Sequence, residues 1–159
     1  MQGKQSPKNT PAAPTPGSSR TAAQSREVLD RFYLRVLGFA YQVLGDAELA
    51  AQAAESIFLQ SKPPATELAV WQAAMQAMQA YVARGFVVRP LVPLGQGWQA
   101  KVLAGLATLQ PLERALLLLR YHEGLEPGLL AEVLGRKESE LRAQIAAARG
   151  ALLDQMDAS

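Results

Sequence analysis

The segment that most constrains the fold is residues 109–152, which read LQPLERALLLLRYHEGLEPGLLAEVLGRKESELRAQIAAARGAL. Apolar residues recur along it at spacings of three and four, and this periodicity predicts three successive helices. Pro111 suits a first helical position, where its missing N–H costs nothing. Gly124 and Gly135 can adopt the left-handed conformation that ends a helix. The third helix should begin at Glu138 and turn one face inward, formed by Leu141, Ile145, Ala148 and Leu152.

The last two of these helices are joined by a tight turn at Gly135. Short helices connected in this way are typical of the helix-turn-helix motif, whose second helix enters the DNA major groove. An ordinary helical hairpin in a bundle has the same spacing. The periodicity therefore leaves a DNA-binding motif and a structural hairpin as alternatives.

The order of the residues in this segment resembles the promoter-distal module of bacterial sigma factors, especially the small extracytoplasmic-function group. The shared features are a Leu and Pro at the start, an Arg, a Leu-rich run to Arg-Tyr, then Glu-Gly-Leu and a short helix that ends in Leu-Gly. The matching positions are Leu109, Pro111, Arg114, Leu116 to Tyr121, Glu123, Gly124, Leu125, Ala131, Glu132, Leu134, Gly135, Ala148, Arg149, Ala151 and Leu152. This resemblance implies a helix-turn-helix that contacts promoter DNA.

A first helical unit is predicted over residues 25–84. Ser25, Asp46 and Thr66 are suited to cap its three helices, and Pro63-Pro64 separates the second helix from the third. The inward positions are apolar in all three: Leu29, Phe32, Tyr33, Val36, Leu37, Ala40 and Leu44, then Ala50, Ala54, Ile57 and Phe58, then Leu68, Trp71, Met75, Met78, Tyr81 and Val82. The stripe of Met and aromatic residues indicates core packing.

This first unit also resembles the sigma family. Residues 32–60 are similar to the polymerase-binding module, with its Leu-Gly-Asp turn at residues 44–46, and Trp71 stands where the promoter-melting helix of the family often begins. The resemblance covers residues 30–153. It implies three partners, namely the RNA polymerase core, promoter DNA and, in addition, an anti-sigma protein, and it places polymerase contacts at Glu48, Glu55 and Phe58.

The domain organisation predicted from these patterns is all-α, with two small helical units joined by a linker. The second unit, residues 98–159, contains the helix-turn-helix and opens with a short helix over residues 98–107. Residues 85–97 are rich in Gly and Pro and form the linker. Residues 1–24 have almost nothing to bury, so we expect a disordered tail. The alternative for this tail is a basic arm that touches nucleic acid through Lys4, Lys8 and Arg20.

Positive charge is poorly placed for binding duplex DNA, which requires Lys or Arg against its phosphates. The whole chain has a net charge of +2, but from Pro127 onward four basic side chains face five acidic ones. Ala and Gly hold most outward positions of the last helix. On the helix of Trp71, Gln and Ala stand where the resemblance implies Arg and Asn that contact melted promoter DNA. The candidate DNA contacts are Arg136, Lys137, Ser139, Arg142 and Arg149.

Catalytic and metal-dependent functions find no support in the sequence. His122 is the only histidine and cysteine is absent, so neither a nucleophile–base pair nor a metal cluster can be assembled. We therefore expect no catalytic residue, no metal and no cofactor. The chain lacks an apolar run of membrane-spanning length and a secretory signal, so we expect a cytoplasmic protein with no membrane partner.

Two functions follow from the sequence. The first is a sigma-like initiation factor that binds RNA polymerase and promoter DNA. The second is a sigma-derived regulatory protein that has lost autonomous promoter binding and acts through protein contacts. A localised basic stripe on the folded surface would favour the first function.

Overall fold

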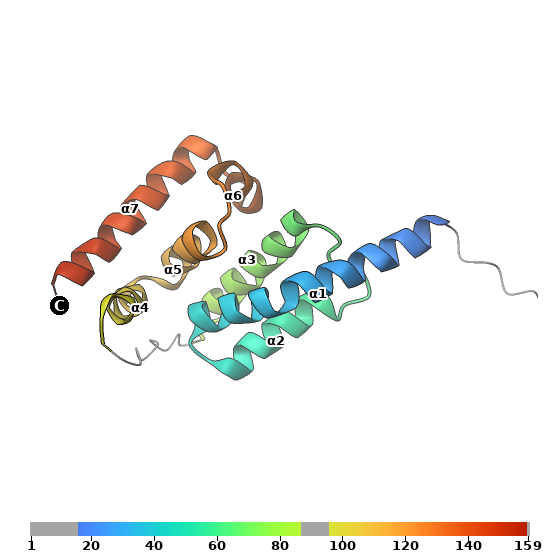
Figure 1. Cartoon of the computed structure of the whole chain (residues 1–159), viewed down its shortest axis with the longest axis horizontal. Coiled ribbons are helices and arrows are strands. Elements are labelled where there is room, and N and C mark those ends of the chain that lie inside the picture. The colour runs from blue at the N-terminus through green and yellow to red at the C-terminus, as the bar shows by residue number, and fades with distance from the viewer. Residues whose placement is uncertain (1–15, 87–95, 159) are drawn as a thin grey trace, which may run out of the picture.

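The computed structural model describes residues 16–86 and 96–158, and all regular secondary structure in these two ranges is helical. The predicted all-α class is therefore confirmed. Helices α1–α3 form one group, and the remaining helices form a second group beside it (Figure 1). The helices are α1 (Pro16–Leu44), α2 (Ala47–Phe58), α3 (Glu67–Ala83), α4 (Trp98–Thr108), α5 (Pro111–Leu117), the π-helix η1 (Leu118–His122), α6 (Pro127–Leu134) and α7 (Glu138–Asp157).

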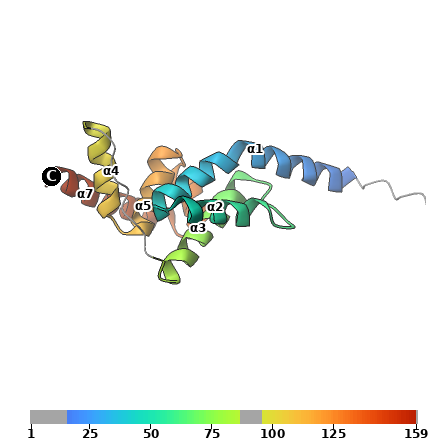
Figure 2. The same cartoon turned by 90° about the horizontal axis from the view of Figure 1, so that it is seen from below.

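The first helix begins at Pro16 and not at the expected Ser25. Pro16 is suited to a first helical position, and the following residues include Ala22 and Ala23, which favour helix. The helix therefore extends over residues 16–24, where the sequence predicts a disordered tail. Residues 1–15 and 87–95, which hold the rest of the predicted tail and most of the predicted linker, lie outside the described residues. The first turns of α1 project beyond the other helices (Figure 2).

The predicted caps of α2 and α3 are confirmed. The side chain of Asp46 accepts a hydrogen bond from the backbone N–H of Leu49 at 3.0 Å, and Oγ1 of Thr66 accepts one from the N–H of Ala69 at 3.1 Å. Each bond satisfies a backbone donor that the first turn of a helix leaves without an intrahelical partner.

Replacing Asp46 with alanine should lower the free energy of unfolding by about 1 kcal/mol, because the Leu49 N–H loses its acceptor. Asp46→Asn keeps a side-chain oxygen at the same position and should cost only a few tenths of that. Urea unfolding of both variants measures the difference. Equal losses for the two variants would mean that the cap contributes nothing beyond the charge of the aspartate.

An aromatic cluster fills the core of α1–α3, as the apolar pattern predicted. Trp71 has no exposed surface, and two phenylalanine rings pack nearly perpendicular to it: Phe32 at 6.3 Å and Phe39 at 5.7 Å between ring centroids. Both pairs are T-shaped, the geometry that aromatic quadrupoles favour. The indole N–H of Trp71 has no hydrogen-bond partner among the described residues.

Both groups of helices share one core. Their buried side chains form a single hydrophobic cluster, and α1 packs on α5 while α3 packs on α5 and α6. Gln72 of α3 donates a hydrogen bond to the backbone oxygen of Glu132 in α6 at 3.4 Å. The segments predicted as two units therefore lie against each other over an apolar surface.

Arg114 is a buried charged residue at this junction, with 3% of its surface exposed. Its guanidinium donates to the carbonyl oxygens of Gln42 (3.4 Å) and Val43 (2.8 Å) in the last turn of α1. It also donates to three carbonyl oxygens at and just after the C-terminus of α4, those of Leu106 (2.8 Å), Ala107 (3.2 Å) and Leu109 (3.1 Å). These oxygens lie at the negative ends of two helix dipoles. Burial lowers the pKa of the Arg114 guanidinium.

A second arginine, Arg35, connects the groups about two turns before the C-terminus of α1. Nε of Arg35 lies 2.8 Å from Oε2 of Glu123, whose side chain is 6% exposed, and Nη2 donates to the Glu123 carbonyl at 3.3 Å. The same guanidinium lies over the rings of Phe32 and Trp71, at 5.0 and 5.5 Å from their centroids. Arg35 therefore joins the aromatic core of the first group to the end of η1.

The segment predicted as one helix from Pro111 to Glu123 changes its winding at Leu118. It is α-helical up to Leu117 and π-helical over η1, where the N–H of Glu123 bonds the Leu118 carbonyl at 2.9 Å. Gly124 ends this segment with a φ of 74°, as expected from its freedom to adopt the left-handed conformation.

Candidate nucleic-acid interface

The turn between α6 and α7 is held by backbone hydrogen bonds around Gly135. Gly135 adopts the left-handed conformation (φ 62°, ψ 37°). Its N–H bonds the Glu132 carbonyl at 3.3 Å, and the N–H of Arg136 bonds the Ala131 carbonyl at 3.0 Å. This pair of bonds is the Schellman motif, which favours glycine because other residues are strained in that conformation. The turn predicted from the sequence is confirmed.

Helix α7 packs one apolar seam against α4, α5 and α6. Leu141, Ile145 and Ala148 are 0%, 6% and 4% exposed, and Leu152 is half-buried. The predicted inward face is thus confirmed. Of the positions predicted to face outward, Gly150 is half-buried and the others are exposed. The exposed positions are Ser139, Arg142, Ala143, Ala146 and Ala147.

Arg142 is engaged by an acidic neighbour on its own helix. Nη2 and Nε of Arg142 donate to Oε1 of Glu138 at 2.8 and 3.1 Å. Both side chains are well exposed, so the pair adds only about 0.3–0.5 kcal/mol to stability. The carboxylate nevertheless neutralises the cation on this exposed face.

Arg149 lies almost directly above Arg142 on α7. At 3.6 residues per turn, two positions seven residues apart differ by only about 20° around the helix axis. Nη1 of Arg149 donates to the hydroxyl of Tyr121 in η1 at 3.0 Å, which is a neutral partner. Arg142 and Arg149 therefore lie on one exposed face, together with Ala146.

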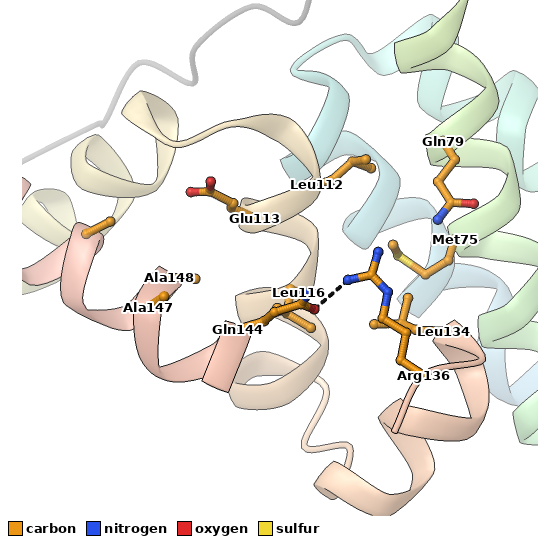
Figure 3. Close-up of a pocket in the computed structure, with 11 residues that line it drawn as sticks. Met75, Gln79, Leu112, Glu113, Leu116, Leu134, Arg136, Gln144, Ala147 and Ala148 are labelled. Carbon is orange, nitrogen blue, oxygen red and sulfur yellow. Dashed lines mark hydrogen bonds between the residues drawn. The ribbon is translucent and has the colours of Figure 1, made fainter. Parts of the chain in front are cut away.

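Arg136 points toward a different side of α7. Nη1 of Arg136 donates to Oε1 of Gln144 at 2.5 Å, and Gln144 is about 160° around the helix from Arg142. Both residues line a cavity of about 350 Å³ between α3, α5 and α7 (Figure 3). Met75 and Gln79 of α3 face them across it. The predicted DNA contacts therefore do not form one stripe.

Lys137 and Ser139 are exposed at the start of α7. Lys137 is the residue before the helix and makes no side-chain cap to it. The first turn contains Glu138 and Glu140, which interact favourably with the helix dipole but repel phosphate. The positive end of α7 is thus partly offset by its own acidic residues.

The three predicted polymerase contacts differ in accessibility. Glu48 and Glu55 are exposed on α2. Phe58 is 4% exposed and packs on Tyr33, with ring centroids 5.7 Å apart. A side chain so deeply buried offers a partner little surface, so Phe58 belongs to the core, and only Glu48 and Glu55 remain as candidate contact residues.

Two partners of the candidate DNA contacts were not predicted from the sequence: Tyr121, which binds Arg149, and Gln144, which binds Arg136. Tyr121 lies 28 residues before Arg149, and Gln144 lies on a helical face that periodicity assigns to solvent. No local sequence pattern could therefore identify either residue as a partner.

His122 is exposed, as expected. In residues 16–86 and 96–158, no group of three or more His, Cys, Asp or Glu side chains is placed to hold a metal ion. Within the same ranges, no helix is both long and apolar enough to cross a bilayer.

The chain matches no known protein-family model, and no curated protein is significantly similar to it.

Proposed function

We propose that this chain is a sigma-like transcription initiation factor that binds the RNA polymerase core and promoter DNA. The observation that carries the proposal is the α6–Gly135–α7 turn, with α7 packed by one seam and its opposite face exposed. On this proposal Arg142 and Arg149 contact phosphates from the exposed face of α7. Ser139 lies at the start of the same face, and Lys137 approaches the backbone from the turn.

Two acidic residues on α2, Glu48 and Glu55, are the proposed polymerase contacts. Both are exposed, and the buried seam of the same helix, with Ala50, Ala54 and Ile57, fixes the direction in which they point. The interaction would be electrostatic, with basic side chains of the polymerase. Such rim charges influence mainly the rate of association and the salt dependence of a complex.

A second candidate function is a sigma-derived protein that acts through protein contacts alone. The observation that favours it is the pairing of the cations: Arg142 is neutralised by Glu138, and Arg136 is turned away from the exposed face by Gln144. The exposed face then offers mainly methyl groups, which make few contacts with base edges.

The two functions predict different salt dependence of promoter binding. For the sigma-like factor, about two to four neutralised phosphates give a slope of about −2 to −4 in a plot of log K against log salt, measured with polymerase present. Arg142→Ala should reduce the steepness by about one and weaken all sequences alike. Fluorescence anisotropy of a labelled promoter fragment measures both. If polymerase-dependent promoter binding is absent at every salt concentration, the sigma-like function is rejected and the function through protein contacts alone remains.

The ion pair of Arg142 provides a matched control. Glu138→Gln should strengthen promoter binding, because it releases Arg142 and removes a repulsive charge. Glu140→Gln removes the same charge from the same turn but not from the ion pair, so it should have the smaller effect. Equal effects of the two variants would mean that Arg142 does not contact DNA.

A further inference from the structure

A second groove, with a volume of about 570 Å³, lies between α4 and the C-terminal half of α7, with η1 at one side. This volume falls in the range of roughly 300–1,000 Å³ that is typical of small-molecule sites. The walls are formed mainly by apolar side chains, with Trp98, Val102 and Leu103 from α4 and Leu152, Leu153 and Met156 from α7.

Large apolar side chains remain exposed to water at this groove. Trp98 is 72% exposed and Leu153 is 52% exposed. Water contact with such surface is unfavourable in proportion to its area. A ligand with an apolar body would cover both side chains, so the groove favours an apolar occupant.

The polar side chains of the groove favour an anion. Among its described lining residues, Arg149 and His122 can carry positive charge, and none is acidic. The neutral hydroxyl of Tyr121 accepts a hydrogen bond from Arg149, whereas the two ion pairs of the described residues involve Arg35 and Arg142. The guanidinium of Arg149 is therefore in neither of these ion pairs and has further donors to offer.

We propose that this groove binds a free long-chain carboxylate. The alkyl chain lies between α4 and α7, and the carboxylate accepts charge-assisted hydrogen bonds from Arg149, with the Tyr121 hydroxyl beside it. Along α7, about 10 Å separates Arg149 from Met156, so the charged and apolar ends of the groove are spaced to match an amphipathic ligand. The argument for this site does not use the proposed role in transcription, although Arg149 is also a proposed phosphate contact, so a carboxylate and DNA would compete for it.

Isothermal titration of the full chain with octanoate, decanoate and dodecanoate, each below its micelle concentration, tests the proposal. We expect one site per chain, with affinity that rises by up to about fourfold for each added methylene group. The fluorescence of Trp98 should change on binding, and Trp98→Phe should remove that change because the other tryptophan, Trp71, is buried. Failure of dodecanoate to bind would overturn the proposal.

Charge recognition is tested separately. Arg149→Gln should weaken dodecanoate binding by about tenfold or more while leaving the weaker binding of 1-dodecanol unchanged. Lys101→Gln removes the same charge from α4 at an exposed position outside the groove and should leave dodecanoate binding as in the parent. Equal affinity for dodecanoate and dodecanol, or equal effects of the two variants, would overturn the carboxylate assignment.

Two other occupants are distinguished by parallel measurements. Vesicles of phosphatidylglycerol that bind the chain when monomeric dodecanoate does not would identify a membrane contact. Sedimentation velocity that shows a dimer, with the Trp98 signal dependent on protein concentration and not on dodecanoate, would identify a second copy in the groove. Either result overturns the proposal.

Discussion

Replacing Arg114 with leucine should lower the free energy of unfolding by about 3–5 kcal/mol, because several buried carbonyl oxygens lose a charged donor at about 1–3 kcal/mol each. The guanidinium donates to carbonyl oxygens at the C-termini of both α1 and α4, and it is 3% exposed. Leucine fills part of its volume but donates no hydrogen bond, so these oxygens lose a charged donor, although the Leu106 carbonyl still accepts from the N–H of Leu109 at 3.2 Å. Since both helix ends lose their partner together, the junction between the two groups of helices should loosen.

Urea unfolding of the full chain at neutral pH, followed by circular dichroism, measures this effect. Arg142→Leu is the matched control, because it removes an exposed arginine whose ion pair is worth about 0.5 kcal/mol at most. Arg114→Lys keeps the charge but presents its donors from a single nitrogen, so it should restore only part of the loss. A loss below about 1 kcal/mol for Arg114→Leu would contradict the role assigned to this side chain.

The shared core also determines the shape of that transition. Because buried residues of both groups form one cluster, the parent chain should unfold in a single cooperative step. Arg114→Leu should separate this step into two, since the apolar contacts within α1–α3 do not depend on the arginine. Two steps already in the parent would mean that the groups fold independently of each other.

The helices of residues 109–152 could be predicted from the sequence because their boundaries depend on local chemistry. Pro111 and Gly135 restrict the backbone at their own positions, whatever surrounds them, and both occupy the positions expected of them. The buried seam of Leu141, Ile145 and Ala148 was equally predictable, because a period of 3.6 residues determines which side chains share a face. The caps at Asp46 and Thr66 belong to the same class of local signal.

The packing between the groups could not be predicted, because it depends on residues far apart in the chain. The local sequence around Arg114 gives no sign that this side chain is buried. Nothing local indicates that it binds Val43, which precedes it by 71 residues. Phe58 illustrates the same limit: an aromatic residue near a helix end can face a partner or the core, and only the position of Tyr33 decides between them.

For the candidate interface, the sequence predicts how many charged residues there are but not the direction in which their side chains point. Composition showed correctly that basic residues are few near α7. It could not show that Arg136 turns toward Gln144 and away from Arg142, because both directions are open to a long side chain at a turn. The distribution of charge on this surface is therefore a property of the folded arrangement.

Leu141→Asp should destabilise the chain by several kcal/mol and unfold the helices around α7. Leu141 has no exposed surface, and α7 packs there on α5 and α6. An ionised carboxylate at this position would lose its hydration without gaining a partner, which costs about 3–5 kcal/mol at neutral pH. Thermal unfolding followed by circular dichroism measures the change. Ala143→Asp, two residues away on the exposed face of the same helix, carries the same charge and should melt close to the parent.

The pH dependence of this variant separates burial of charge from loss of apolar packing. Burial raises the pKa of an introduced carboxyl group above its value in the unfolded chain, so the folded state binds the proton more tightly. The destabilisation should therefore be largest at neutral pH and should shrink as the pH falls through the raised folded pKa toward the unfolded value. Leu141→Asn has a similar shape but does not titrate, so its loss relative to the parent should be insensitive to pH over that range. If Leu141→Asp and Leu141→Asn showed the same dependence on pH, the carboxyl group would be reaching water, and the inward face of α7 would be wrongly assigned.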